Sequence, residues 1–357
     1  MPRPIHALID SDALHHNLRV VRRRTSARIM AVIKANAYGH GLLAAADALK
    51  QADGFALLDL QDAIKLREAG FRQTILLLEG FFTAEDLVLC AEYDLACVIH
   101  SASQLDMLDA YPRRGGLQVW LKINTGMNRL GFSPADFAMV NARLNQHPAV
   151  REVTLMTHFS HADEVAGVAN QLERFETLTE SRRQPRSLAN SAAIVRFPAT
   201  HADWVRPGIM LYGASPFGFD ATFPSAQELG LRPVMTLRSE ILSIQEIKTG
   251  ESVGYAGLFR ADRAMKIGIV ACGYADGYPR HAPTGTPVLV NGQRSRTLGR
   301  VSMDMLALDL SGIGAVGEGD PVTLWGEGLP VEEVAHAAGT ISYELLCALA
   351  PRVRLAY

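Results

Sequence analysis

The sequence predicts an α/β chain with a (β/α)8 barrel followed by a mostly β domain. Between residues 10 and 215, short apolar or β-branched runs alternate with segments of helical spacing. Eight such runs fit a closed barrel better than an open sheet. After about residue 230 the chain becomes strand-rich, with glycine and proline turns between the strands. We therefore expect a barrel domain at residues 1–230 and a C-terminal β domain at residues 231–357.

The barrel elements follow one another along the first part of the chain. Asp10 or Ser11 is suited to cap a first helix, in which Leu14, Leu18 and Val21 share one face. The expected strands are 29–35, 54–59, 74–79, 95–100, 118–124, 153–159, 187–190 and a segment near 209–212. The expected helices between them are 42–51, 62–69, 84–91, 102–109, 134–144 and 168–182.

The second domain is expected to contain mostly strands. Its strand-rich segments are 234–247, 264–273, 287–310 and 320–326, and one helical segment lies at 331–339. The dipeptide Asn291-Gly292 lies within the strand-rich segment 287–310 and predicts a hairpin.

Composition and charge exclude several classes of protein. The 357 residues include 35 Lys+Arg and 37 Asp+Glu, a net charge of −2, so the basic excess of a nucleic-acid binder is missing. No apolar run approaches the roughly 18 residues of a membrane span, and we expect no signal peptide. Four cysteines without CxxC spacing suggest reduced thiols in a cytoplasmic protein. The histidines are scattered without a Cys/His cluster, so we expect no metal.

Lys34 ends the first expected barrel strand, where the active sites of such barrels lie. A lysine after four apolar residues is costly to bury as a cation. Either its amine reaches solvent or it is a functional amine with a lowered pKa.

The string AVIKANAYGHG at residues 31–41 closely resembles the pyridoxal-phosphate attachment signature of alanine racemases. Further segments resemble the family in the same order along nearly the whole chain. They are LIDSDALHHNL (8–18), LKINTGMNRLGF (121–132), HFSHAD (158–163), ANSAA (189–193), DWVRPGIMLYG (203–213), VGYAGLF (253–259), CGYADGYPR (272–280), GRVSMDM (299–305) and ISYELL (341–346). The resemblance implies a fold-type III pyridoxal-phosphate enzyme.

The resemblance implies interconversion of L- and D-alanine by two bases acting on a pyridoxal 5'-phosphate aldimine. Lys34 would bind the cofactor and act on one face of the substrate Cα. Tyr255 of the partner subunit would act on the other face, so the family implies a homodimer with shared sites. The activity would supply or recycle D-alanine, a peptidoglycan precursor.

The family also assigns the residues that hold cofactor and substrate. Arg206 would face the pyridine nitrogen without giving up its proton, and His158 would join it in a relay toward Tyr255. The other cofactor residues implied are Tyr38, Asn190, Ser191, Gly208, Ile209 and Tyr343. The substrate residues implied are Arg129, Tyr274, Met303 and Asp304, with Asp163, Arg280, Arg300 and Ile341 farther out along the entry.

Two positions qualify this assignment. Lys122 matches a lysine that is often carbamylated in the family, where it would orient Arg129. Without carbamylation the two cations repel each other, so we expect either the modification or a bound anion. Ser187 stands where some relatives carry a histidine stacked on the cofactor ring.

Three other functions are compatible with parts of this pattern. A broader racemase for serine or lysine differs only in pocket volume. A non-catalytic pyridoxal-phosphate carrier would need neither Tyr255 nor the β domain. Barrel decarboxylases typically use a Cys-Asp-Gly segment, and the nearest sequence here is CGYADG (272–277).

Overall fold

The computed structural model describes residues 3–112 and 115–357, which fall into two compact units. The barrel unit comprises residues 17–37 and 42–211. The β unit comprises the N-terminal residues up to His16, residues 38–41 and residues 212–357.

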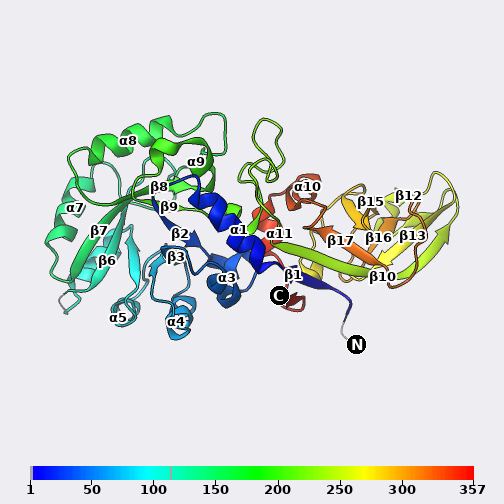
Figure 1. Cartoon of the computed structure of the whole chain (residues 1–357), viewed down its shortest axis with the longest axis horizontal. Coiled ribbons are helices and arrows are strands. Elements are labelled where there is room, and N and C mark those ends of the chain that lie inside the picture. Colours follow the sequence, from blue (N-terminus) through cyan, green and yellow to red (C-terminus); the bar gives the residue numbers. More distant parts are fainter. Residues whose placement is uncertain (1–2, 113–114) are drawn as a thin grey trace. The chain divides into compact units, whose positions relative to one another are not determined.

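Eight parallel strands close into a barrel within the barrel unit (Figure 1). They are β2 (Arg28–Val32), β3 (Gly54–Leu57), β4 (Thr74–Leu77), β5 (Ala96–Ile99), β6 (Leu117–Lys122), β7 (Val150–Met156), β8 (Arg186–Asn190) and β9 (Trp204–Arg206). The circuit closes where β9 pairs with β2, with Arg28 opposite Trp204. The predicted (β/α)8 fold class is confirmed.

Helices lie on the outside of the barrel strands (Figure 1). The helices of the chain up to residue 212 are α1 (Ser11–Arg22), α2 (Lys34–Tyr38), α3 (Leu42–Ala48), α4 (Leu60–Glu68), α5 (Ala84–Glu92), α6 (Ala102–Asp109), α7 (Phe137–Gln146), α8 (Ala169–Thr179), α9 (Ser191–Arg196) and the 3-10 turns η1 (Pro198–Thr200) and η2 (Ile209–Tyr212). The strands between them are buried on both faces, as parallel strands under helices must be; β3 and β5 are buried at all four positions.

The expected eighth strand near 209–212 is wrong. The closing strand is β9, three residues long, and Ile209–Tyr212 forms the turn η2 instead. Pro207 follows β9 directly and has no N–H for a ladder, although its carbonyl accepts from Val32 N at 2.9 Å. The run 209–212 is fully buried, and an apolar run alone does not distinguish a buried turn from a strand.

The β unit is built on an eight-stranded sheet in the order β13-β16-β15-β14-β17-β10-β1-β18, and β10 also pairs with β13. The strands are β1 (His6–Ile9), β10 (Met235–Ile247), β13 (Met265–Val270), β14 (Pro287–Val290), β15 (Gln293–Leu298), β16 (Leu306–Asp309), β17 (Pro321–Trp325) and β18 (Arg354–Ala356). The remaining elements are the hairpin β11 (Ser252–Val253) and β12 (Phe259–Arg260), the helices α10 (Val331–Ala337) and α11 (Ser342–Cys347), and the turns η3 (Tyr255–Gly257) and η4 (Tyr274–Asp276).

The two ends of the chain meet in this sheet. Strand β1 runs antiparallel to β10 and parallel to β18, so the first strand of the sequence belongs with the last ones. The predicted hairpin at Asn291-Gly292 joins β14 to β15, and both residues have the positive φ values, 50° and 74°, that such a turn requires.

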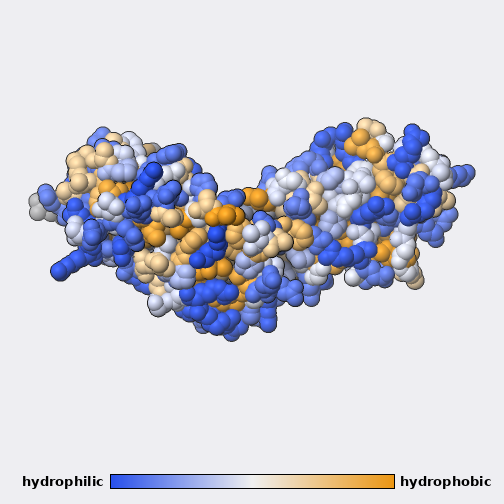
Figure 2. Space-filling model, turned by 90° about the horizontal axis from the view of Figure 1, so that it is seen from above, coloured by the Kyte–Doolittle hydropathy of each residue, from blue (hydrophilic) through white to orange (hydrophobic). Residues whose placement is uncertain are grey.

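Hydrophilic residues cover much of the visible surface, with apolar residues among them (Figure 2). Within residues 3–112 and 115–357, no helix combines the length and apolar character that a membrane crossing requires.

Candidate active site

Lys34 lies just past the carboxyl end of β2 and begins a left-handed turn. Ala35, Asn36, Ala37 and Tyr38 have φ values of 53° to 55°, which makes α2 a left-handed turn of non-glycine residues. Such a backbone costs about 1–2 kcal/mol for each L-residue. The strain is therefore concentrated next to the lysine, where a functional site is the usual explanation.

Two hydrogen bonds within the barrel unit hold this turn. Ala37 N donates to the carbonyl of Ile33 at 3.0 Å, and Leu42 N donates to Asn36 Oδ1 at 2.9 Å. The backbone that carries Lys34 is thus held in place just past the carboxyl end of β2.

Three further strands bring cationic or titratable side chains to the same end of the barrel. Lys122 is the last residue of β6, His158 follows β7, and Arg206 is the last residue of β9. Burial and then the charges of Arg206 and Arg129 lower the pKa of Lys122, Glu79 raises it, and Lys34 lowers it further. Several positive charges therefore meet at the carboxyl end of the barrel.

Arg206 is a buried cation among neutral acceptors. Its guanidinium donates to Ser187 Oγ at 2.5 Å and to the carbonyls of Thr157 at 2.7 Å and Leu188 at 3.1 Å. Burial lowers its pKa to about 9, so it stays charged at neutral pH. A buried guanidinium whose acceptors, among the residues that the structure describes, are neutral is placed to meet an electron-rich ligand group.

His158 lies next to the Arg206 guanidinium. Burial, and then the charges of Arg206 and Lys122, lower the pKa of His158 well below its usual value. The ring is consequently neutral, and its Nδ1 accepts from Arg206 Nη2 at 3.4 Å. The structure thus brings together the His158–Arg206 pair that the sequence predicts.

Lys122 and Arg129 line a small cavity of about 10 Å³ together with Thr125, Thr157 and His158. Burial, followed by the charge of Arg206, lowers the pKa of Lys122 to about 8. This lowered pKa favours the neutral form of the Lys122 amine more than in an exposed lysine.

The predicted phosphate residues of the barrel unit lie at or just past the carboxyl ends of β8 and β9. Gly208 N donates to Ser191 Oγ at 2.8 Å, which joins two of them. Asn190 Oδ1 caps α9 by accepting from Ala193 N at 3.1 Å, so Asn190 has at least a structural role. Ile209 follows Gly208 and is buried.

Tyr38 and Tyr343 lie together within the β unit. Their ring centroids are 6.0 Å apart, and Tyr38 also stacks on Tyr212 at 4.5 Å. Burial raises the pKa of the Tyr38 hydroxyl, which therefore stays protonated and able to donate.

Three of the other predicted residues of the β unit are exposed, and Asp304 is half-buried. Tyr255 on η3 is 70% exposed, Met303 52% and Tyr274 39%. Tyr274 N donates to the carbonyl of Ser302 at 3.0 Å, which brings Tyr274 next to the loop of Met303 and Asp304. Tyr255 lies on a separate turn.

The outer residues Asp163 and Arg280 are exposed, as is Ile341 at 60%. Arg300 is half-buried.

The sequence analysis missed two residues that shape the site. Ser187 is fully buried and holds Arg206, although the sequence suggested only the loss of an aromatic ring there. Asp276 is also fully buried, next to Tyr274, where it accepts from Arg3 and Arg352. No sequence signal distinguishes either residue from an ordinary turn or strand position.

Comparisons with known proteins find two family domains along the chain. The alanine racemase N-terminal domain matches residues 9–216, and the alanine racemase C-terminal domain matches residues 234–357. The chain belongs to the alanine racemase family.

Individual members of the alanine racemase family align over nearly the whole chain. The alanine racemases of Nitrosospira multiformis and Nitrosomonas eutropha are 59% and 61% identical to it, over 99% of this chain and 99% and 98% of theirs. The biosynthetic alanine racemase of Pseudomonas aeruginosa is 48% identical, with a TM-score of 0.96 and 99% of both chains covered. The alanine racemase of Acinetobacter baumannii has a TM-score of 0.92 at 39% identity, again over 99% of both chains.

The Arg206–His158 contact predicts a change in the titration of His158. Burial lowers the pKa of His158 most and the charge of Arg206 adds to this, so replacing Arg206 with Met should raise the pKa of His158. Histidine side-chain NMR over a pH series measures this change.

Ser187→Ala is the matched control for this titration. It removes an acceptor of Arg206 but keeps the charge, so His158 should titrate as in the wild type. Near-ultraviolet circular dichroism checks that Arg206→Met remains folded. An unchanged pKa in a folded Arg206→Met protein would contradict the electrostatic account.

Proposed function

We propose that this chain interconverts L-alanine and D-alanine with pyridoxal 5'-phosphate as its cofactor. The observation that carries the proposal is the electropositive barrel end, where a strained turn fixes Lys34 near Arg206 and Lys122. Membership of the alanine racemase family supports the same reaction.

The residues present suit this cofactor. Arg206 is a buried donor without an anionic acceptor among its contacts, which fits a pyridine nitrogen or another electron-rich atom. Ser191, Gly208 and Ile209 supply hydroxyl and backbone groups for a phosphate, with Tyr38, Asn190 and Tyr343 as further candidates. When bound, the cofactor supplies an aldehyde for amines and an electron-withdrawing ring that acidifies the substrate Cα–H.

Two groups move the proton in this proposal. The Lys34 amine takes or returns a proton on one face of Cα. The Tyr255 hydroxyl of the partner subunit does so on the opposite face. A tyrosine near its ordinary pKa of about 10 is a weak base at neutral pH, so it needs cationic support. Arg206, acting through the neutral ring of His158, is placed to provide this support in the proposed relay.

The substrate carboxylate is assigned to Arg129, whose planar guanidinium suits a carboxylate. The partner subunit would contribute Tyr274, Met303 and Asp304. Asp163, Arg280, Arg300 and Ile341 would line the entry.

A homodimer with shared sites follows from this assignment. Tyr255 is too exposed to belong to the interior of its own unit. Large apolar side chains near the predicted partner-facing residues are also exposed, as expected of an interface. They are Leu258, Met305 and Ile341. We place the dimer in the cytoplasm, where it would supply or recycle D-alanine for peptidoglycan.

We further propose that Lys122 carries a carbamate. The ammonium first loses one proton; the neutral amine then adds to CO2, forming a nitrogen–carbon bond as one C=O π bond of CO2 breaks, and a second proton leaves, so a cation becomes an anion. The anion would accept from Arg129 across the small cavity that both residues line. This change would remove the repulsion between the two cations.

A test of the two-base assignment uses exchange of the substrate α-hydrogen in deuterated solvent. Tyr255→Phe should keep exchange with one enantiomer of alanine and lose it with the other, because Lys34 remains. Lys34→Ala should lose the base on the opposite face. Mass spectrometry of each enantiomer measures the exchange, and Tyr93→Phe in the barrel unit is the control.

Full exchange of both enantiomers by Tyr255→Phe would remove the two-base scheme. Parallel assays with serine and lysine separate a narrow racemase from a broad one. A wild-type protein that binds the cofactor without any exchange would be the non-catalytic carrier.

Mixed dimers test whether the sites are shared. In a dimer of Lys34→Ala with Tyr255→Phe, one site carries both substitutions and the other carries neither. Random pairing makes half of the dimers mixed, so activity should recover to about a quarter of the wild type. Lys34→Ala mixed with the double variant has no intact site and should stay inactive. The same inactivity in the first mixture would place Tyr255 in its own chain's site.

The carbamate predicts a pH-dependent signal. With ¹³C-bicarbonate, a protein-bound carbamate resonance should grow as the pH rises through about 8, because the neutral amine is the reactive form. Lys122→Met should lack the resonance, whereas Lys65→Met, at an exposed lysine on α4, should keep it. Neither a carbamate nor a bound anion beside Lys122, by mass and electron density, would refute the proposal.

A further inference from the structure

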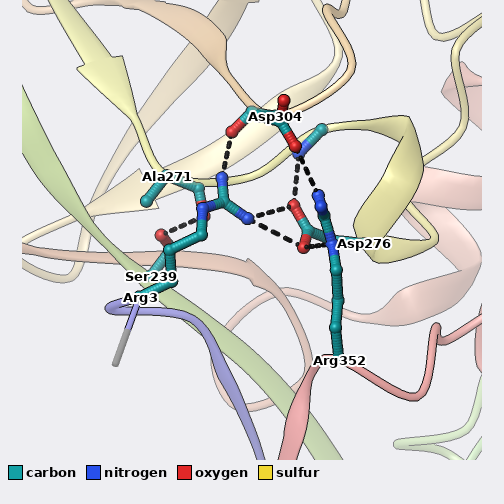
Figure 3. Close-up of polar contacts among 7 residues, drawn as sticks. Arg3, Ser239, Ala271, Asp276, Asp304 and Arg352 are labelled. Carbon is teal, nitrogen blue, oxygen red and sulfur yellow. Dashed lines mark hydrogen bonds and ion pairs between the residues drawn. The ribbon is translucent and has the colours of Figure 1, made fainter. Parts of the chain in front are cut away.

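Asp276 has a fully buried carboxylate at the end of the turn η4, two residues after Tyr274. Arg3 Nη1 donates to both of its oxygens at 2.9 Å, and Arg352 Nε donates to Oδ1 at 2.7 Å. The backbone N of Gly273 donates to Oδ2 at 2.9 Å. Figure 3 shows the carboxylate between the two guanidinium groups. A buried charge is stable only when it is paired in this way.

The same two arginines also hold Asp304. Arg352 Nη2 donates to Asp304 Oδ1 at 2.7 Å, and Arg3 Nη2 donates to the Asp304 carbonyl oxygen (Figure 3). Arg352 therefore bridges a buried carboxylate and a surface carboxylate with two nitrogens of one planar group. Only a guanidinium has this geometry, because an ammonium is a single point of charge.

Backbone contacts join the two loops that these aspartates belong to. Tyr274 N donates to the Ser302 carbonyl and Ala275 N to the Met303 carbonyl, each at 3.0 Å. Gly273 has no room for a side chain, since a Cβ would overlap the carbonyl of Met303. In the part of the chain that the structure describes, the amides of Met303 and Asp304 donate to no acceptor. They remain available to a ligand.

We propose that Arg352 is a positioning residue that fixes the loops of Tyr274 and Asp304 as one substrate-binding surface. Arg3 assists by holding the Asp304 carbonyl. This inference rests on the proposed function, because it takes Tyr274, Met303 and Asp304 as substrate residues. The exposed loops gain their fixed geometry from the buried charge of Asp276.

A second arginine–aspartate ion pair in the β unit serves as a control for Arg352. Arg296 donates to the mostly buried Asp309 through Nε at 3.2 Å and Nη2 at 3.0 Å. That pair joins β15 to β16 in the same unit. Arg296→Ala therefore measures the effect of losing an arginine–aspartate pair in the β unit.

Kinetics of the cofactor-loaded protein test the consequence for substrate. Arg352→Ala should raise KM for alanine about tenfold or more, with a smaller change in kcat. Arg352→Lys should give an intermediate KM, since one ammonium reaches one carboxylate. Arg296→Ala should keep the wild-type KM, and thermal unfolding shows whether each variant is folded.

Hydrogen–deuterium exchange tests the positioning independently of activity. Residues 272–278 and 301–305 should exchange faster in Arg352→Ala than in the wild type, whereas Arg296→Ala should leave both loops unchanged. A wild-type protein without racemase activity would overturn the proposed function, while the exchange result would still decide the positioning. A wild-type KM, or unchanged exchange in both loops, would overturn the role of Arg352.

Discussion

Buried positive charge at the carboxyl end of the barrel is the constraint on which the site depends. Arg206 is held by a serine hydroxyl and backbone carbonyls, and within residues 3–112 and 115–357 no carboxylate is among its hydrogen-bond acceptors. Its charge keeps His158 neutral and helps to lower the pKa of Lys122. Cations gathered in this way are unfavourable without an anionic or electron-rich ligand, so the same arrangement that costs stability prepares the site for binding.

The left-handed turn after β2 is a second feature that lowers stability, and the proposed function accounts for it. Four non-glycine residues in a left-handed conformation are held by local hydrogen bonds and by close packing. Gly39, directly after the turn, has φ +81° and no space for a Cβ beside the carbonyl of Leu346. The position of Lys34 is therefore set by backbone geometry that few sequences tolerate.

The proposed substrate residues of the β unit lie near the protein surface, so their loops need contacts that fix their positions. Tyr274 and Asp304 lie on loops, which are ordinarily mobile. A buried carboxylate with two arginines ties these loops to the first and last segments of the chain. The pairing of β1 with β18 brings those segments together. The sheet topology and the loop geometry are thus linked through Asp276.

The sequence by itself determined the alternation of strands and helices in the barrel, the strand-rich second part of the chain, the place of Lys34 at a strand end, and the Asn291-Gly292 hairpin, because these depend on local periodicity and turn chemistry. Its family resemblance named residues from both parts of the chain. The tertiary structure alone decided that β9 closes the barrel, that Ser187 holds Arg206, and that Arg3 and Arg352 share Asp276. These contacts join residues 19 to 273 positions apart. Local pattern carries no information about such pairs, since only folding brings their atoms together.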